Sequence, residues 1–110
     1  MENNRFNYYY LEYKTYFLDV FCLFDSLQPK IERETEAIFS MFVLALKTNI
    51  RIHLDRPKFL ETHFIDLILK LGRDLRESNR SLIVVGAPES FKRYLKKFEM
   101  DKMILLQEEN

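Results

Sequence analysis

Glycine is scarce in this chain: only Gly72 and Gly86 occur among its 110 residues. Loops that wrap a phosphate group with backbone N–H groups need several glycines, because the backbone must come close to the ligand. The sequence therefore argues against a nucleotide-binding enzyme built on such a loop.

Cysteine is scarcer still, since Cys22 is the single one. A lone cysteine excludes an internal disulfide and any zinc site made of paired cysteines, and it fits a reducing compartment. We expect Cys22 to fill space in the core.

Net charge and long apolar runs are also missing. Seventeen Lys and Arg balance seventeen Asp and Glu, so no overall field favours nucleic acid or an anionic membrane surface. No apolar stretch is long enough to cross a bilayer, and the first residues lack a charged lead followed by an apolar run. We expect a cytoplasmic protein that does not enter a membrane.

Hydrophobic side chains are plentiful, at 47% of the residues with 15% aromatic. That amount is ample for a core, and 110 residues is a common domain size. We expect one domain over residues 1–110.

Strands and helices are predicted to alternate along the chain. Aromatic and β-branched residues over 8–24, broken near Lys14, predict a β-hairpin. Helices are expected at about 29–47, from 62 to about 78, and from Pro88 onward, and further strands at 50–54, 82–85 and 103–106. Helix 29–47 is apolar on more than one stripe, so a second side is either buried in the chain or given to a partner.

The segment 50–54 indicates the architecture. Ile50, Ile52 and Leu54 alternate with Arg51 and His53, which is typical of a strand with one face in the core and one in water. A strand covered on both faces would be apolar throughout. We therefore expect an α/β fold: a mixed, mainly parallel sheet of four to five strands, with an N-terminal β-hairpin and the helices packed on one face.

The second strand of the hairpin raises the possibility of an interface. One face of this strand carries Leu18 and Val20 and is the better core candidate. The opposite face carries Phe17, Asp19 and Phe21. Two phenylalanines on an open sheet face need a cover, either the N-terminal tyrosines or another chain. We predict an interface at Phe17 and Phe21, with a homo-oligomer as one form of it.

Several segments together resemble the STAS domain of bacterial anti-sigma factor antagonists. Asp25 matches the acidic residue that ends the second strand in that family, and Glu61-Thr62-His63-Phe64 is similar to its Asp-Ser-Ser/Thr-Gly turn, although the glycine is replaced. The other similar segments are 50–55 with 59–62, 73–76, 81–85, 88–95 and 100–104. The resemblance covers most of the chain and implies a STAS-like fold.

The resemblance also implies a function. It suggests a non-enzymatic regulatory module without a cofactor, which binds an anti-sigma factor, a related serine kinase or another STAS protein. Thr62 would be the phosphorylated residue, and phosphorylation would release the partner. Asp25, Glu61, Thr62, His63 and Phe64 would form the partner-binding surface.

Two alternatives to this switch stay open. Thr62 could simply be the N-cap of its helix, since threonine is a favoured residue there. The protein could also be a scaffold or assembly protein that is not phosphorylated and associates through Phe17, Phe21 and the surplus apolar side of helix 29–47.

Metal, catalytic and nucleic-acid sites are weaker candidates. His63 with Glu61, and His53 with Asp55, lack the helical spacing of a zinc site, so no metal site is expected, and no nucleophile, base and orienting group can be grouped. The predicted third helix has a basic face that could contact nucleic acid or an acidic partner. That face consists of Lys92, Arg93, Lys96 and Lys97.

Overall fold

The computed structural model describes residues 6–54, 57 and 59–108. Within these residues the chain forms five strands and three helices. They are β1 (Tyr9–Tyr13), β2 (Phe17–Cys22), α1 (Pro29–Ala45), β3 (Asn49–His53), α2 (Thr62–Glu77), β4 (Leu82–Val85), α3 (Glu89–Lys97) and β5 (Leu105–Gln107).

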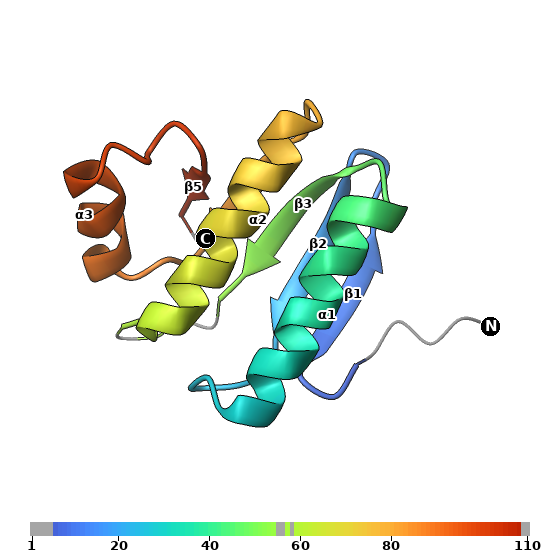
Figure 1. The fold of residues 1–110 in the computed structure, drawn as a ribbon, viewed down its shortest axis with the longest axis horizontal. Helices are drawn as coiled ribbons and strands as arrows, with labels where there is room; N and C mark the ends of the chain where they lie inside the picture. Colours follow the sequence, from blue (N-terminus) through green and yellow to red (C-terminus); the bar gives the residue numbers. More distant parts are fainter. Residues whose placement is uncertain (1–5, 55–56, 58, 109–110) are drawn as a thin grey trace.

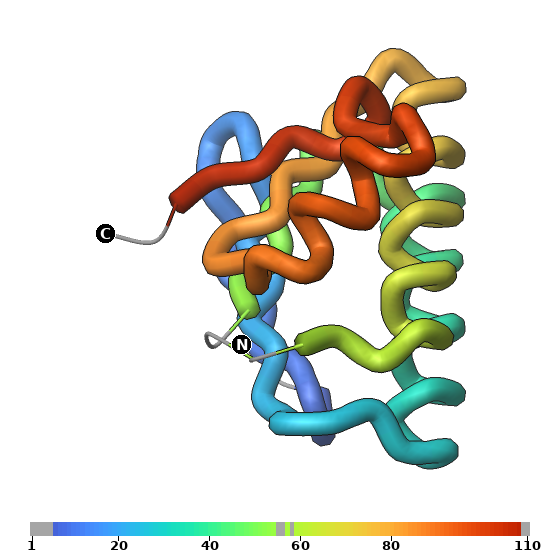
Figure 2. The backbone as a smooth tube through the Cα atoms, turned by 90° about the vertical axis from the view of Figure 1, so that its left-hand side faces the viewer, coloured from blue at the N-terminus to red at the C-terminus, as the bar shows by residue number. Residues whose placement is uncertain are grey.

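The strands form one sheet in the order β1-β2-β3-β4-β5. Figure 1 shows β1, β2 and β3 side by side behind α1 and α2. The β1–β2 hairpin is antiparallel, and β2 to β5 are parallel. Because each right-handed crossover leads to the next strand along, all three helices belong on the same face. Figure 2 shows α1 and α2 as a layer on one side of the sheet. The predicted mixed sheet, with its N-terminal hairpin and helices on one face, is confirmed.

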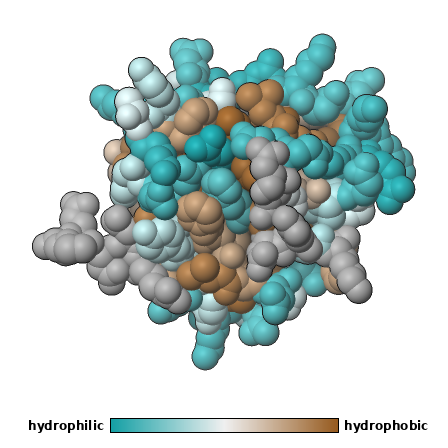
Figure 3. All heavy atoms as spheres, turned by 180° about the vertical axis from the view of Figure 1, so that it is seen from behind, coloured by the Kyte–Doolittle hydropathy of each residue, from teal (hydrophilic) through white to brown (hydrophobic). Residues whose placement is uncertain are grey.

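The core lies between the sheet and this helical layer. Leu18 and Val20 of β2 are opposite Ile50 and Ile52 of β3, and all four side chains are fully buried. This confirms the core face predicted from the alternation. The opposite face of the sheet carries no helix in the described part of the chain, and Figure 3 shows it as a mixture of apolar and polar groups.

Helix α1 begins at Pro29, where the missing N–H costs nothing. Its inner side buries Ile38 and Phe42, whereas Leu44 is 85% exposed. Burial of both sides of α1 within the described chain is therefore wrong. Recruitment of its outer side by a partner stays a prediction.

The last strand starts later than predicted, at Leu105 and not at residue 103. Met103 donates its N–H to the carbonyl of Met100 in a turn, and Ile104 is buried. Ile104 packs against Gly72 of α2, where an added Cβ would lie 2.9 Å from the Ile104 Cγ1. Gly72 is thus required for the close approach of this segment to α2.

Candidate functional site

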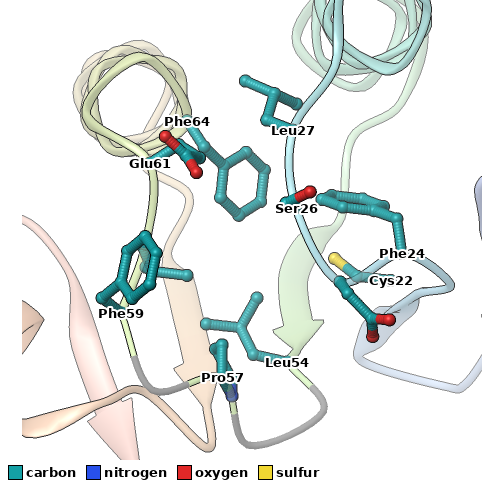
Figure 4. Close-up of a pocket in the computed structure, with 11 residues that line it drawn as sticks. Cys22, Phe24, Ser26, Leu27, Leu54, Pro57, Phe59, Glu61 and Phe64 are labelled. Carbon is teal, nitrogen blue, oxygen red and sulfur yellow. The ribbon is translucent and has the colours of Figure 1, made fainter.

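A pocket lies at the end of the sheet where β2 and β3 stop and their loops lead to α1 and α2 (Figure 4). Its volume is about 300 Å³. The described residues that line it are Cys22, Phe24, Asp25, Ser26, Leu27, Leu54, Pro57, Phe59, Leu60, Glu61 and Phe64. Binding sites gather at this edge in parallel α/β sheets.

The inner wall of the pocket is apolar and belongs to the core. Phe24 and Phe64 make an edge-to-face contact with ring centroids 5.5 Å apart, and Phe64 is only 2% exposed. Phe64 therefore lines the wall of the pocket, and its ring does not protrude toward a partner. Burial raises the pKa of the Cys22 thiol well above its ordinary value, so Cys22 is protonated and unreactive at neutral pH.

The rim of the pocket is exposed and mixed in character. Asp25 and Ser26 come from the β2–α1 loop, and Glu61 precedes α2 on the other side. Phe59 is 63% exposed beside them. The rim therefore combines two carboxylates with a solvent-exposed aromatic ring. Phe59 is therefore an apolar group that a partner could cover at this edge of the sheet.

Thr62 is the first residue of α2 and is exposed. The N-cap is Glu61, whose carbonyl accepts the N–H of Ile65 at 3.0 Å, and no side chain caps the helix. The interpretation of Thr62 as the N-cap is therefore wrong by one position. Thr62 belongs to the first turn of α2, whose first backbone N–H groups have no partner within the helix.

His63 faces α1 and not the pocket. Its Nε2 lies 2.9 Å from Glu32 Oε1 and 3.6 Å from Glu36 Oε1. These neighbours are distant in sequence, so the pairing of His63 with Glu61 could not reveal them. The helical spacing of Glu32 and Glu36 was the available signal.

A second group of polar residues lies on the open face of the sheet. The Asp19 carboxylate accepts hydrogen bonds from Arg51 Nε at 2.5 Å and Nη2 at 3.1 Å, and its Oδ1 lies 2.8 Å from His53 Nε2. Asp55, the sequence-based partner of His53, lies outside the described residues. Asp19 is 2% exposed although it points away from the core.

Phe17 and Phe21 explain how Asp19 is covered. The Phe21 ring stacks on His53 with centroids 4.3 Å apart, and the Arg51 guanidinium lies 4.8 Å from the centroid of Phe17. Both phenylalanines are half-buried by these contacts, with Tyr10 also beside Phe21. An interface at these rings stays a prediction.

The partners of Asp19 favour the ionised form of its carboxyl group. Burial acts to raise the pKa of this carboxyl, but the hydrogen bonds and positive charges of Arg51 and His53 outweigh burial and hold the pKa below its ordinary value. Asp19 is therefore ionised at neutral pH and neutralises Arg51.

The basic face of α3 is partly paired. Lys92 Nζ lies 2.5 Å from Glu108 and 3.7 Å from Glu89, while Arg93, Lys96 and Lys97 are exposed. The two carboxylates reduce the positive charge available to a phosphate backbone. Lys92 is therefore paired in this structure, and nucleic-acid binding through α3 stays a prediction.

Solved structures of similar fold were found, although no protein family and no curated protein matches by sequence. An anti-sigma-factor antagonist (STAS) domain protein from Planctomyces limnophilus matches with a TM-score of 0.74 and 11% identity, covering 93% of this chain and 91% of that one. The chain has the STAS fold.

A second STAS-like match is TM1081 from Thermotoga maritima, a proposed anti-sigma factor antagonist. Its crystal structure matches with a TM-score of 0.68 and 12% identity, covering 94% of this chain and 88% of that one. Its NMR structure gives the same TM-score and identity, and the match covers 98% of this chain and 86% of that one. At such low identity the likeness establishes the fold, which was predicted, and leaves the site to be argued from its own residues. Among the described residues, no helix is both long and apolar enough to span a bilayer.

Proposed function

We propose that this STAS-fold protein is a non-enzymatic regulatory module that binds a protein partner through the rim of the pocket between the β2–α1 and β3–α2 loops. The observation that carries the proposal is the grouping of exposed Phe59 and Thr62 with Asp25 and Glu61 at one edge of the sheet. The similar proteins are described as anti-sigma factor antagonists, which supports a partner such as an anti-sigma factor or a related serine kinase.

Phosphorylation of Thr62 would make this surface a switch. A phosphate adds about −1.5 to −2 charge and can be stabilised by the free N–H groups at the start of α2. The fold would therefore tolerate it. A partner pressed against the rim would have to desolvate the new charge beside Glu61, so phosphorylation would release the partner.

A second candidate is an assembly protein that is not phosphorylated. It is favoured by the half-buried Phe17 and Phe21 on the sheet face without helices, and by exposed Leu44 on α1. In this case copies of the chain would associate and Thr62 would have no regulatory role. Sedimentation at increasing concentration separates the two, because only the assembly protein becomes larger.

The switch is tested with Thr62→Ala and Thr62→Asp. The protein is incubated with extract of its own cells and ATP, phosphate is mapped by mass spectrometry, and partner binding is measured for both variants. We expect phosphate on Thr62, and Thr62→Asp to weaken binding about tenfold or more, which corresponds to about 1.4 kcal/mol.

Ser90 offers a matched control, because it is an exposed hydroxyl residue in the first turn of α3. Ser90→Asp should leave partner binding unchanged. Equal binding by Thr62→Ala and Thr62→Asp, with no phosphate on Thr62, would remove the switch and favour the second candidate.

A further inference from the structure

Two glutamates of α1 and one histidine of α2 meet away from the pocket rim. Glu32 and Glu36 are four residues apart, so their side chains lie on one face of α1. His63, in the first turn of α2, points at both carboxylates. The three potential ligand atoms all lie within 4.8 Å of one another.

Hydrogen bonding within the chain pairs His63 directly with only one of the two glutamates. The His63 Nε2 carries at most one hydrogen, so it can donate to one carboxylate at a time. At 2.9 Å from Nε2, the Glu32 carboxylate is within hydrogen-bond distance. At 3.6 Å, the Glu36 carboxylate is too far for a direct hydrogen bond. Two like charges four residues apart on a helix also repel each other. Water can solvate the exposed Glu36, but a cation among the three groups would contact both carboxylates at once and offset their repulsion.

The geometry suits a small transition-metal ion. Zinc binds imidazole nitrogen and carboxylate oxygen at about 2.0–2.2 Å, which places neighbouring ligand atoms of a tetrahedron about 3.3 Å apart. The two measured separations from His63 Nε2 lie on either side of that value. The third edge, between the two carboxylate oxygens, is at most 4.8 Å long, and the exposed Glu36 side chain has room to rotate and shorten it.

We propose that Glu32, Glu36 and His63 bind a divalent transition-metal ion of the zinc type, which ties α1 to the start of α2. Imidazole with two carboxylates is a ligand set that zinc accepts, and a magnesium or calcium ion would prefer oxygen ligands alone. Three protein ligands leave a fourth position open to water or to a partner's side chain. Because His63 follows Thr62, the ion would fix the turn next to that hydroxyl.

The site is tested by calorimetric titration of the full chain with zinc chloride, and by the visible absorption of cobalt(II) added in its place. We expect one zinc per chain with micromolar affinity, and a tetrahedral cobalt spectrum. Glu36→Gln and His63→Gln should each weaken zinc binding by at least about tenfold. Magnesium at the same concentration should not displace zinc.

Glu77→Gln is the control, because Glu77 is an exposed carboxylate at the far end of α2. It should bind zinc as the unaltered chain does. Circular dichroism without metal should show that all variants are folded, which is expected because none of the three proposed ligands is buried. Failure to bind zinc, or undiminished binding by Glu36→Gln and His63→Gln, would overturn the proposal. Neither result would bear on partner binding at the rim.

Discussion

Asp19 is the residue whose surroundings differ most from what its position suggests. On a sheet face without helices it is nevertheless buried, because Arg51 and His53 hydrogen-bond to its carboxylate and Phe17 and Phe21 pack over these partners. The alternation of β2 and β3 predicted the face correctly. It could not predict the pairing, because the register between strands distant in sequence is set by the folded sheet.

Replacing Asp19 by Asn should destabilise the protein by about 2 kcal/mol, because Arg51 loses its charged partner while remaining partly buried. Chemical denaturation at neutral pH measures this. Phe21→Leu serves as a comparison, since it disturbs the same face without removing a charge.

The same residue predicts a pH dependence. The pKa of Asp19 is lower in the folded protein than its unfolded value of about 3.9, so its stabilising effect is complete above that value and is lost as the pH falls toward the folded pKa. Between neutral pH and about pH 3, Asp19→Asn should therefore lose less stability than the original chain. Parallel acid unfolding curves for the two proteins would contradict this.

At the scale of elements, α2 and α3 end in the same way. Asn79 and Glu99 follow the two helices with positive φ angles of 59° and 55°. The next residues, Arg80 and Met100, donate their N–H to Leu75 and Leu95, respectively, closing each helix end. Asn tolerates this left-handed conformation, whereas Glu does not favour it.

Glu99→Gly should therefore stabilise the protein by about 1 kcal/mol, because glycine adopts the left-handed conformation without strain. Thermal and denaturant unfolding measure the gain. Asn79→Gly is the matched control and should give a smaller gain. A loss of stability in Glu99→Gly would show that its side chain has another role.

Element positions were largely predictable, but the contacts between elements were not. The side-chain pattern located every strand and helix because alternation and helical spacing are local. Arg80 shows the limit: its guanidinium donates to the carbonyls of Phe42, Val43 and Leu46 at the end of α1, a contact that no local pattern indicates. The proximity of His63 to α1 escaped prediction for the same reason.

At the scale of the whole molecule, the one-sided fold separates two surfaces. The loops after β2 and β3 form the pocket rim, and the sheet face opposite the helices carries Phe17 and Phe21. The resemblance to STAS domains implied that Asp25, Glu61 and Thr62 share a surface, and the structure places Asp25 and Glu61 at one pocket. The exposure of Phe59 could not be predicted from the sequence, because it depends on the path of its loop.

The claim that a partner docks on the rim is tested most directly by site-specific photo-crosslinking in cells, with the crosslinking residue placed at Phe59 or at Phe21. The account predicts that position 59 captures a different protein and that phosphorylation-mimicking Thr62→Asp reduces this capture. Capture of copies of the chain from position 21, with no capture from position 59, would contradict it.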